Sequence, residues 1–333
     1  MNRKLIGAVL LGMVVFAPAQ TALAHGGNGG ASSDYRIEVI GYDGDHDGYI
    51  VRPVELGNRM ELVRTTADEV QILGYEKEPY LRLDKDGVFE NVNSPAHYAN
   101  LDRFQRIPIP ATANAKAAPN WVKLSDGNSI RWHDHRTHWM SPTPRQDVRD
   151  TPNETHVIFD DSRVELLVNG NPAAAIVKVT WLPPPSRMVW LVITTISACA
   201  LLAGLVLVPS LRRFVPLLAL IAAIACLVGS GSSSFRIVAS AAAIVLAIVG
   251  WAMRNRWVSA TSSLIVVVLA VTHFEVFEHE LLAGWAAAPL QRVAIGIALA
   301  CGAAVVGCEL VVGLGATTTT ETIEPLEPVA VES

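Results

Sequence analysis

The chain changes character at Trp181–Arg187, where the sequence reads WLPPPSR. Before this point polar and apolar residues alternate in short runs, and after it come long apolar stretches. Three successive prolines cannot continue a strand, and they form a stiff linker. The sequence therefore predicts two regions of different kinds, joined by a Pro-rich linker over residues 184–187.

The second region, 188–314, contains five apolar segments close to the ~20 residues that a helix needs to cross a hydrocarbon core. A hydrophobic content of 51% over the whole chain also exceeds that of an ordinary soluble protein. We predict a bundle of about five transmembrane helices. Because the second is short, four spans plus a re-entrant segment is the alternative. The expected helices are 188–209, 214–228, 237–253, 258–277 and 293–314.

The first 24 residues have the pattern of an export signal. A basic start is followed by an apolar run, and small residues at Ala22 and Ala24 precede His25. We predict a signal peptide over residues 1–24 with cleavage before His25, while a second cleavage pattern ends at Ala19. The region that follows the signal is then exported.

Basic residues predict the orientation of the helices. With the first region outside, the pairs Arg212–Arg213 and Arg254–Arg256 fall on the cytoplasmic side, as the positive-inside rule requires. The tail 315–333 is acidic and lacks aromatic residues, so we expect it to be disordered in the cytoplasm. These features predict a multi-pass protein of a bacterial cell membrane with a large extracytoplasmic N-terminal domain.

Residues 25–183 predict an all-β sandwich of the immunoglobulin or cupredoxin-like kind. All four cysteines lie in the second region, so this domain depends on a hydrophobic core and not on disulfides. Short β-rich runs are separated by turn-forming Asp, Asn and Gly residues. The expected strands are 35–42, 59–65, 69–75, 80–83, 121–124, 156–159, 163–170 and 174–182.

The stretch Trp132–Met140, WHDHRTHWM, concentrates three histidines in six residues. If it is extended, His133 and His135 point to one face, and two imidazoles at this spacing suit zinc or copper, while His138 points to the other face beside Asp134. If it is helical, the pair splays apart. The competing interpretation is structural: the tryptophans anchor a bend, Asp134 pairs with Arg136, and the histidines are hydrogen-bonded neutral groups.

Two other stretches carry possible ligands. Asp43, Asp45 and Asp47 imitate the start of a calcium loop, but the required twelfth ligand is absent, and a solvated turn between strands fits better. At the outer end of the fourth predicted helix, Glu275 and His279 are four residues apart. A helix would place them on one face, and they form a possible second site.

The first region resembles two groups of exported proteins. The leading His25, the β-rich domain, the His-Asp-His at 133–135 and the following spans resemble copper-binding sandwiches of the CopC type. That resemblance implies copper binding in which His25 assists, although glycines follow His25 here where that family enters a strand. WHDHRTHWM together with ELGNRMELVRTTADEVQILGYEKEPYLRL is similar to uncharacterised actinobacterial envelope proteins, which bring no activity with them.

These observations lead to one working hypothesis and one rival. The hypothesis is a membrane protein whose exported domain binds or senses a transition metal, copper or else zinc, through His133, His135, His138 and His25. The rival is a non-catalytic interaction or scaffold protein, bound to another envelope protein, with a structural WHDHRTHWM. No nucleophile motif, phosphate loop or zinc-protease motif occurs, so we expect no enzyme. A net charge of -5 without a basic stripe predicts no nucleic-acid partner.

Overall fold

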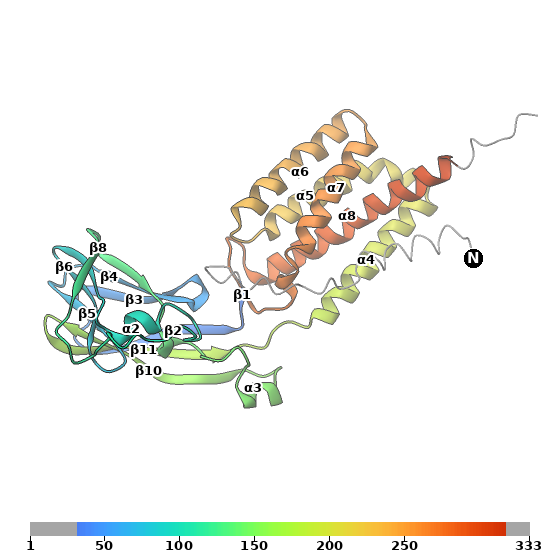
Figure 1. Cartoon of the computed structure of the whole chain (residues 1–333). Helices are drawn as coiled ribbons and strands as arrows, with labels where there is room; N and C mark the ends of the chain where they lie inside the picture. Colours follow the sequence, from blue (N-terminus) through green and yellow to red (C-terminus); the bar gives the residue numbers. More distant parts are fainter. Residues whose placement is uncertain (1–31, 318–333) are drawn as a thin grey trace, which may run out of the picture. The chain divides into compact units, whose positions relative to one another are not determined.

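The structure, a computed structural model, describes residues 32–317, so the expected signal peptide and His25 lie outside the described residues. The chain divides into two compact units (Figure 1). The β unit contains residues 32–185 together with the short segment Glu278–Ala283, and the helical unit contains Ser186–Phe277 and the residues from Gly284 onward.

The β unit is built from antiparallel sheets. A seven-stranded sheet has the order β2-β11-β10-β5-β6-β7-β8, and a three-stranded sheet has the order β3-β4-β9. Two short helices, α2 and α3, lie in its connections. The bounds are β2 Tyr35–Gly44, β3 Tyr49–Val54, β4 Arg59–Arg64, β5 Val70–Leu73, β6 Pro79–Asp84, β7 Gly87–Asn91, α2 Pro95–Ala99, β8 Trp121–Ser125, β9 Ser129–Trp132, α3 Gln146–Asp150, β10 His156–Val168 and β11 Asn171–Trp181.

Both sheets contribute to one hydrophobic core. Met60 and Leu62 of β4 are fully buried, and Glu61 between them is also buried but pairs with Arg52 and Arg131. Met60 and Leu62 belong to the same buried cluster as Ile72 of β5 and Val164 and Leu166 of β10. The predicted antiparallel β region, held by apolar packing without disulfides, is confirmed. Its immunoglobulin or cupredoxin-like topology stays a prediction.

The strands agree with the predicted runs, with three additions. β3, β7 and β9 were not expected, and the two runs predicted between His156 and Gly170 form the single long strand β10, which contains irregularities in register. β3 could not be predicted from the sequence because it follows the Asp-rich turn directly and contains Pro53. β9 is only four residues long, which is too short for its alternation to be read from sequence.

A further strand pair was not foreseen. β1, Ser32–Ser33, pairs with β12, Leu281–Leu282, in an antiparallel two-stranded sheet. β12 lies in the connection between the last two long helices of the chain, yet its segment belongs to the β unit. The β unit is therefore built from two separate parts of the chain.

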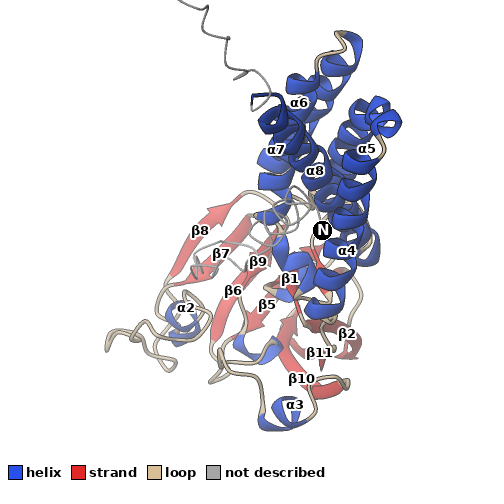
Figure 2. Ribbon diagram, turned by 90° about the vertical axis from the view of Figure 1, so that its right-hand side faces the viewer, coloured by secondary structure: helices blue, strands red, loops and turns tan. Residues whose placement is uncertain are grey.

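The helical unit consists mainly of the helices drawn in blue as α4 to α8 (Figure 2). Several of its segments are long and apolar enough to cross a membrane. Four segments meet that criterion, and α8 packs against α4, α5 and α7. The cysteines are free thiols, and Cys301 and Cys308 are buried, as expected. The bounds are α4 Arg187–Leu207, α5 Val215–Gly229, α6 Ser234–Ala252, α7 Arg256–Val271 and α8 Ala288–Thr317.

Three helix predictions need correction. The second segment is not short, because a 3₁₀ turn precedes α5 and the two form a continuous stretch, Pro209–Gly229, of 21 residues. The fourth is shorter than predicted: α7 ends at Val271 and not at Phe277. The polar residues that follow lack the apolar pattern of the preceding turns, and the hydroxyl of Thr272 bonds a carbonyl of the last turn. α8 also continues to Thr317, into the predicted tail.

Truncation of the shared core should destabilise the β unit. Leu62 is fully buried, so we expect Leu62→Ala to lower the free energy of unfolding by about 2–5 kcal/mol. Ile50, on the neighbouring strand β3, is 50% exposed, and Ile50→Ala should change it by about 0.5 kcal/mol or less. Urea unfolding of the detergent-solubilised chain, followed by tryptophan fluorescence, measures both. Equal effects of the two substitutions would contradict the assigned core.

Candidate metal centre

The stretch Trp132–Met140 leaves the sheet and turns. β9 ends at Trp132, and a single 3₁₀ turn occupies His135–Thr137. Asp134 begins this turn because its side chain accepts a hydrogen bond from the backbone N–H of Arg136, 3.0 Å away. The stretch is therefore extended only as far as Asp134, with φ -139° and ψ 117°, and it turns there because the carboxylate of Asp134 caps the turn. The rings of His133 and His135 still lie close together, with centroids 5.2 Å apart.

A buried ion pair holds the turn in place. The side chain of Asp134 is fully buried, and Arg136 donates to both of its oxygens, at 2.9 Å from Nε and 2.7 Å from Nη2. The indole N–H of Trp132 donates to the same carboxylate at 2.9 Å. Such a set of donors offsets the high cost of taking the charges out of water. The expected pair of Asp134 with Arg136 is confirmed, and it occupies both oxygens of the carboxylate.

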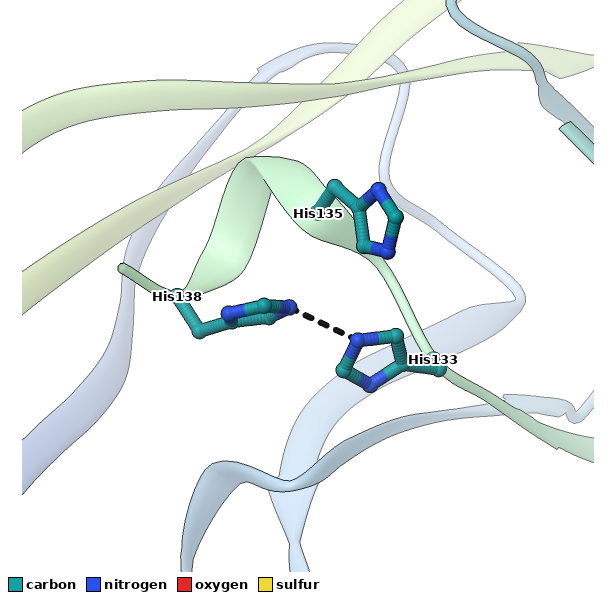
Figure 3. A group of neighbouring side chains, drawn as sticks. All are labelled: His133, His135 and His138. Atoms are coloured by element: carbon teal, nitrogen blue, oxygen red, sulfur yellow. Dashed lines mark hydrogen bonds between the residues drawn. The ribbon is translucent and has the colours of Figure 1, made fainter. Parts of the chain in front are cut away.

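The turn brings the three histidines together. His135 and His138 are three residues apart across the turn, and His133 approaches from the end of β9. One ring nitrogen from each lies within 4.8 Å of the others, and Figure 3 shows the three rings around a common space. Within residues 32–317 this is the one group of three or more His, Cys, Asp or Glu side chains that converges as a metal site would.

Backbone carbonyls orient each ring. His133 Nδ1 is 2.8 Å from the carbonyl oxygen of Asn58, and His138 Nδ1 is 3.0 Å from that of Trp139. His135 Nε2 is 3.0 Å from the carbonyl oxygen of Asp102. A carbonyl oxygen only accepts hydrogen bonds, so each of these ring nitrogens carries the proton. Contacts of this kind fix ring orientation and tautomer around metal sites.

The tautomers create an unusual contact between two rings. His133 Nε2 and His138 Nε2 lie 2.7 Å apart. When the proton of a neutral imidazole is on Nδ1, its Nε2 holds a lone pair and has no hydrogen to donate. Two such lone pairs repel each other. A cation shared between them, either a proton or a metal ion, turns this repulsion into attraction.

Protonation of these rings is disfavoured. Burial, with the nearby Arg103 guanidinium adding to it, lowers the pKa of His138 to about 3. Burial also lowers the pKa of His133 and that of His135 below the ordinary value of 6.5. Neutral imidazoles with available lone pairs are the form that binds metal ions at pH 7.

The arrangement fits a metal ion after small adjustments. Two nitrogen ligands at about 2.0 Å from a tetrahedral ion are roughly 3.3 Å apart, so His133 and His138 would separate by a few tenths of an ångström. Binding through Nε2 of His135 would exchange its contact with the Asp102 carbonyl for the metal. Three imidazoles would hold the ion and leave one coordination position open.

The Asp-rich stretch forms a turn between β2 and β3. Asp45 accepts a hydrogen bond from the backbone N–H of Asp47 at 3.0 Å, and Asp43 forms an ion pair with Arg163. The structure does not bring the three carboxylates together as it does the histidines. The solvated turn favoured by the sequence therefore describes this stretch.

The predicted pair of Glu275 and His279 loses its geometric basis, because α7 has ended before either residue. Glu275 Oε1 lies 3.7 Å from a nitrogen of Arg236 and 3.7 Å from His273 Nε2. His279 Nδ1 lies 2.9 Å from a carboxylate oxygen of Asp34, which lies between β1 and β2 in the same β unit. The helical spacing that motivated this second site is absent.

The residues that contact the three histidine rings or act on them could not be identified from the sequence. Asn58 and Asp102 act through backbone carbonyls, for which no side-chain pattern exists. Arg103, whose charge acts on all three rings, lies in the long connection between α2 and β8, which has no periodic pattern. The predicted assisting ligand His25 lies outside the described residues and stays a prediction.

Loss of the buried ion pair should destabilise the β unit. Asp134→Ala leaves Arg136 without its partner in a largely buried position, so we expect a loss of about 3–5 kcal/mol in the free energy of unfolding. Asp126→Ala, which removes a carboxylate that is 94% exposed, is the matched control and should change the free energy of unfolding far less. Urea unfolding compares the two variants. A small effect at Asp134 would show that the pair does not hold the turn.

The stability of the metal-free chain should fall in acid. The pKa of His138 is lower in the folded chain than its ordinary value of 6.5, so the unfolded chain binds more protons between about pH 6.5 and pH 3. The free energy of unfolding therefore decreases as the pH falls through this window, by up to roughly 1.4 kcal/mol per pH unit from this group. Urea unfolding at a series of pH values measures the slope. His138→Gln should reduce it, and an unchanged slope in this variant would contradict the assignment.

Comparison with known proteins finds no relative of this chain. No family model matches the chain, and neither a curated protein nor a solved structure matches it.

Proposed function

We propose that the chain is a multi-pass bacterial membrane protein whose β unit binds copper through His133, His135 and His138. The observation that carries the proposal is the 2.7 Å approach of two Nε2 atoms in rings that donate through Nδ1. Four helices long and apolar enough to span a bilayer support membrane insertion.

The donor set favours a late first-row transition metal. Magnesium and calcium prefer oxygen ligands, whereas neutral imidazoles suit copper and zinc. Copper(II) binds such nitrogen sites more tightly than zinc, which is the alternative metal. Three fixed imidazoles would hold the copper ion, and the ion would supply one open coordination position. We propose a binding or sensing role for it and not catalysis.

The proposed topology places the β unit outside the cytoplasm. It rests on the export signal at residues 1–24 and on the basic residues expected on the inner side, Arg212, Arg213, Arg254 and Arg256. Cleavage before His25 would start the mature chain with a histidine, which we propose assists the triad. The bilayer is the one partner that the long apolar helices support.

The rival proposal is a non-catalytic interaction or scaffold protein that contacts another envelope protein. The specific observation in its favour is that every ring of the triad already contacts a protein carbonyl, and that the Asp134–Arg136 pair is buried with both carboxylate oxygens bonded. In that case WHDHRTHWM would be structural, and copper would not bind tightly.

Copper titration of the full chain in an uncharged detergent separates the two proposals. The full chain is required because β12 contributes to the β unit from beyond residue 183. We expect one ion per chain at micromolar copper or below, and a loss of about 100-fold or more in affinity in His133→Ala/His138→Ala, since removal of supporting groups alone costs 10–100-fold. The control His46→Ala removes an exposed histidine and should bind as the parent chain does.

No binding at micromolar copper, or equal binding in the double variant, would end the metal proposal. If the double variant unfolds without metal, the titration uses His133→Asn/His138→Gln in its place, because this variant keeps polar side chains of similar size at both positions. A folded variant that still binds copper as the parent does would favour the scaffold proposal.

A further inference from the structure

A positive charge beside the triad has no carboxylate partner within residues 32–317. The guanidinium of Arg103 donates to the side-chain oxygen of Asn58 at 2.9 Å. The backbone oxygen of Asn58 contacts His133. Asp102 is next to Arg103 in the chain, and its carbonyl oxygen contacts His135. The amide of Asn58 is neutral, so this hydrogen bond leaves the charge of Arg103 unbalanced.

The carboxylate next to Arg103 in the chain, that of Asp102, and the carboxylate between the first two histidines, that of Asp134, are already paired. Asp102 Oδ1 lies 2.6 Å from Nη2 of Arg106, and Asp134 Oδ2 lies 2.7 Å from Nη2 of Arg136. Together with Arg103, three arginines face two aspartates, which leaves one positive charge beside three neutral rings. A divalent metal ion raises this excess to three charges.

The charge of Arg103 lies beside the triad. Arg103 is connected to the ring of His133 through Asn58, and its chain neighbour Asp102 contacts the ring of His135. The positive charge of Arg103 repels a bound metal ion, and this repulsion is stronger in a partly buried site than in water. An anion bound beside Arg103 would offset this repulsion.

We propose that the metal is bound together with a small oxyanion, such as a carboxylate or hydrogen carbonate. One oxygen of the anion takes the position that three histidines leave open, and another pairs with Arg103. The planar fork of a guanidinium matches two oxygens of a carboxylate-like group, which favours an oxyanion over a halide. This inference rests on the metal-binding function proposed above.

An Arg103 substitution changes copper affinity in opposite directions depending on whether an oxyanion is bound. Without an anion, Arg103 only repels the metal, so Arg103→Gln would tighten copper binding. With the oxyanion bound, Arg103 holds the shared ligand, so the same substitution weakens copper binding. Metal and anion then also increase each other's affinity by the same factor.

The experiment measures copper affinity of the full chain in an uncharged detergent, first in perchlorate and then in acetate or hydrogen carbonate at equal ionic strength. We expect either oxyanion to tighten copper binding by about tenfold or more, as a hydrogen bond to a charged group does. Arg103→Gln should lose this gain, and Arg103→Lys should keep only part of it. Arg163→Gln removes the same charge at an exposed site paired with Asp43 and should retain the full gain.

Equal affinity of the parent chain in perchlorate and in both oxyanions would overturn the proposal. Tighter copper binding by Arg103→Gln in every medium would overturn it as well, and both results leave the metal site itself intact. If the parent chain binds no copper in any medium, the proposed function fails first, and the oxyanion proposal fails with it.

Discussion

The buried ion pair between Asp134 and Arg136 is the interaction on which the histidine triad depends. It anchors a 3₁₀ turn at the end of β9, and Trp132 ties the same carboxylate to the hydrophobic core. Without this anchor, β9 could continue as a strand and its successive side chains would alternate between two faces. The carboxylate of Asp134 therefore shapes the backbone that carries the three histidine rings.

The triad is assembled from three connections of the β unit. Asn58 follows a 3₁₀ turn whose Leu56 has a φ of 55°, Asp102 lies in the long segment before β8, and the rings themselves come from the turn after β9. The sheets provide a rigid base, and loops on such a base commonly carry function. A metal ion held by the triad would link these loops and stabilise the folded chain by mass action.

Much of the fold could be predicted from the sequence because it depends on patterns of apolar residues. The alternation that buries Met60 and Leu62 is visible in the sequence, as are the long apolar helices. The site could be predicted only in part. The three histidines were identified, but the extended chain considered for them ends at Asp134. The turn that brings His138 to the other two rings is capped by the side chain of Asp134, which competes with a continued strand. Asn58 and Asp102 contribute through carbonyl oxygens that every residue has.

The most direct test of the metal centre is X-ray absorption spectroscopy at the copper edge of the loaded full-length chain. The account predicts three imidazole nitrogens at about 2.0 Å and no sulfur ligand, with one further light atom in the open position. In the His133→Ala/His138→Ala variant the imidazole scattering should fall sharply. Sulfur in the first shell, or the same imidazole signal in that variant, would contradict the assignment of copper to His133, His135 and His138.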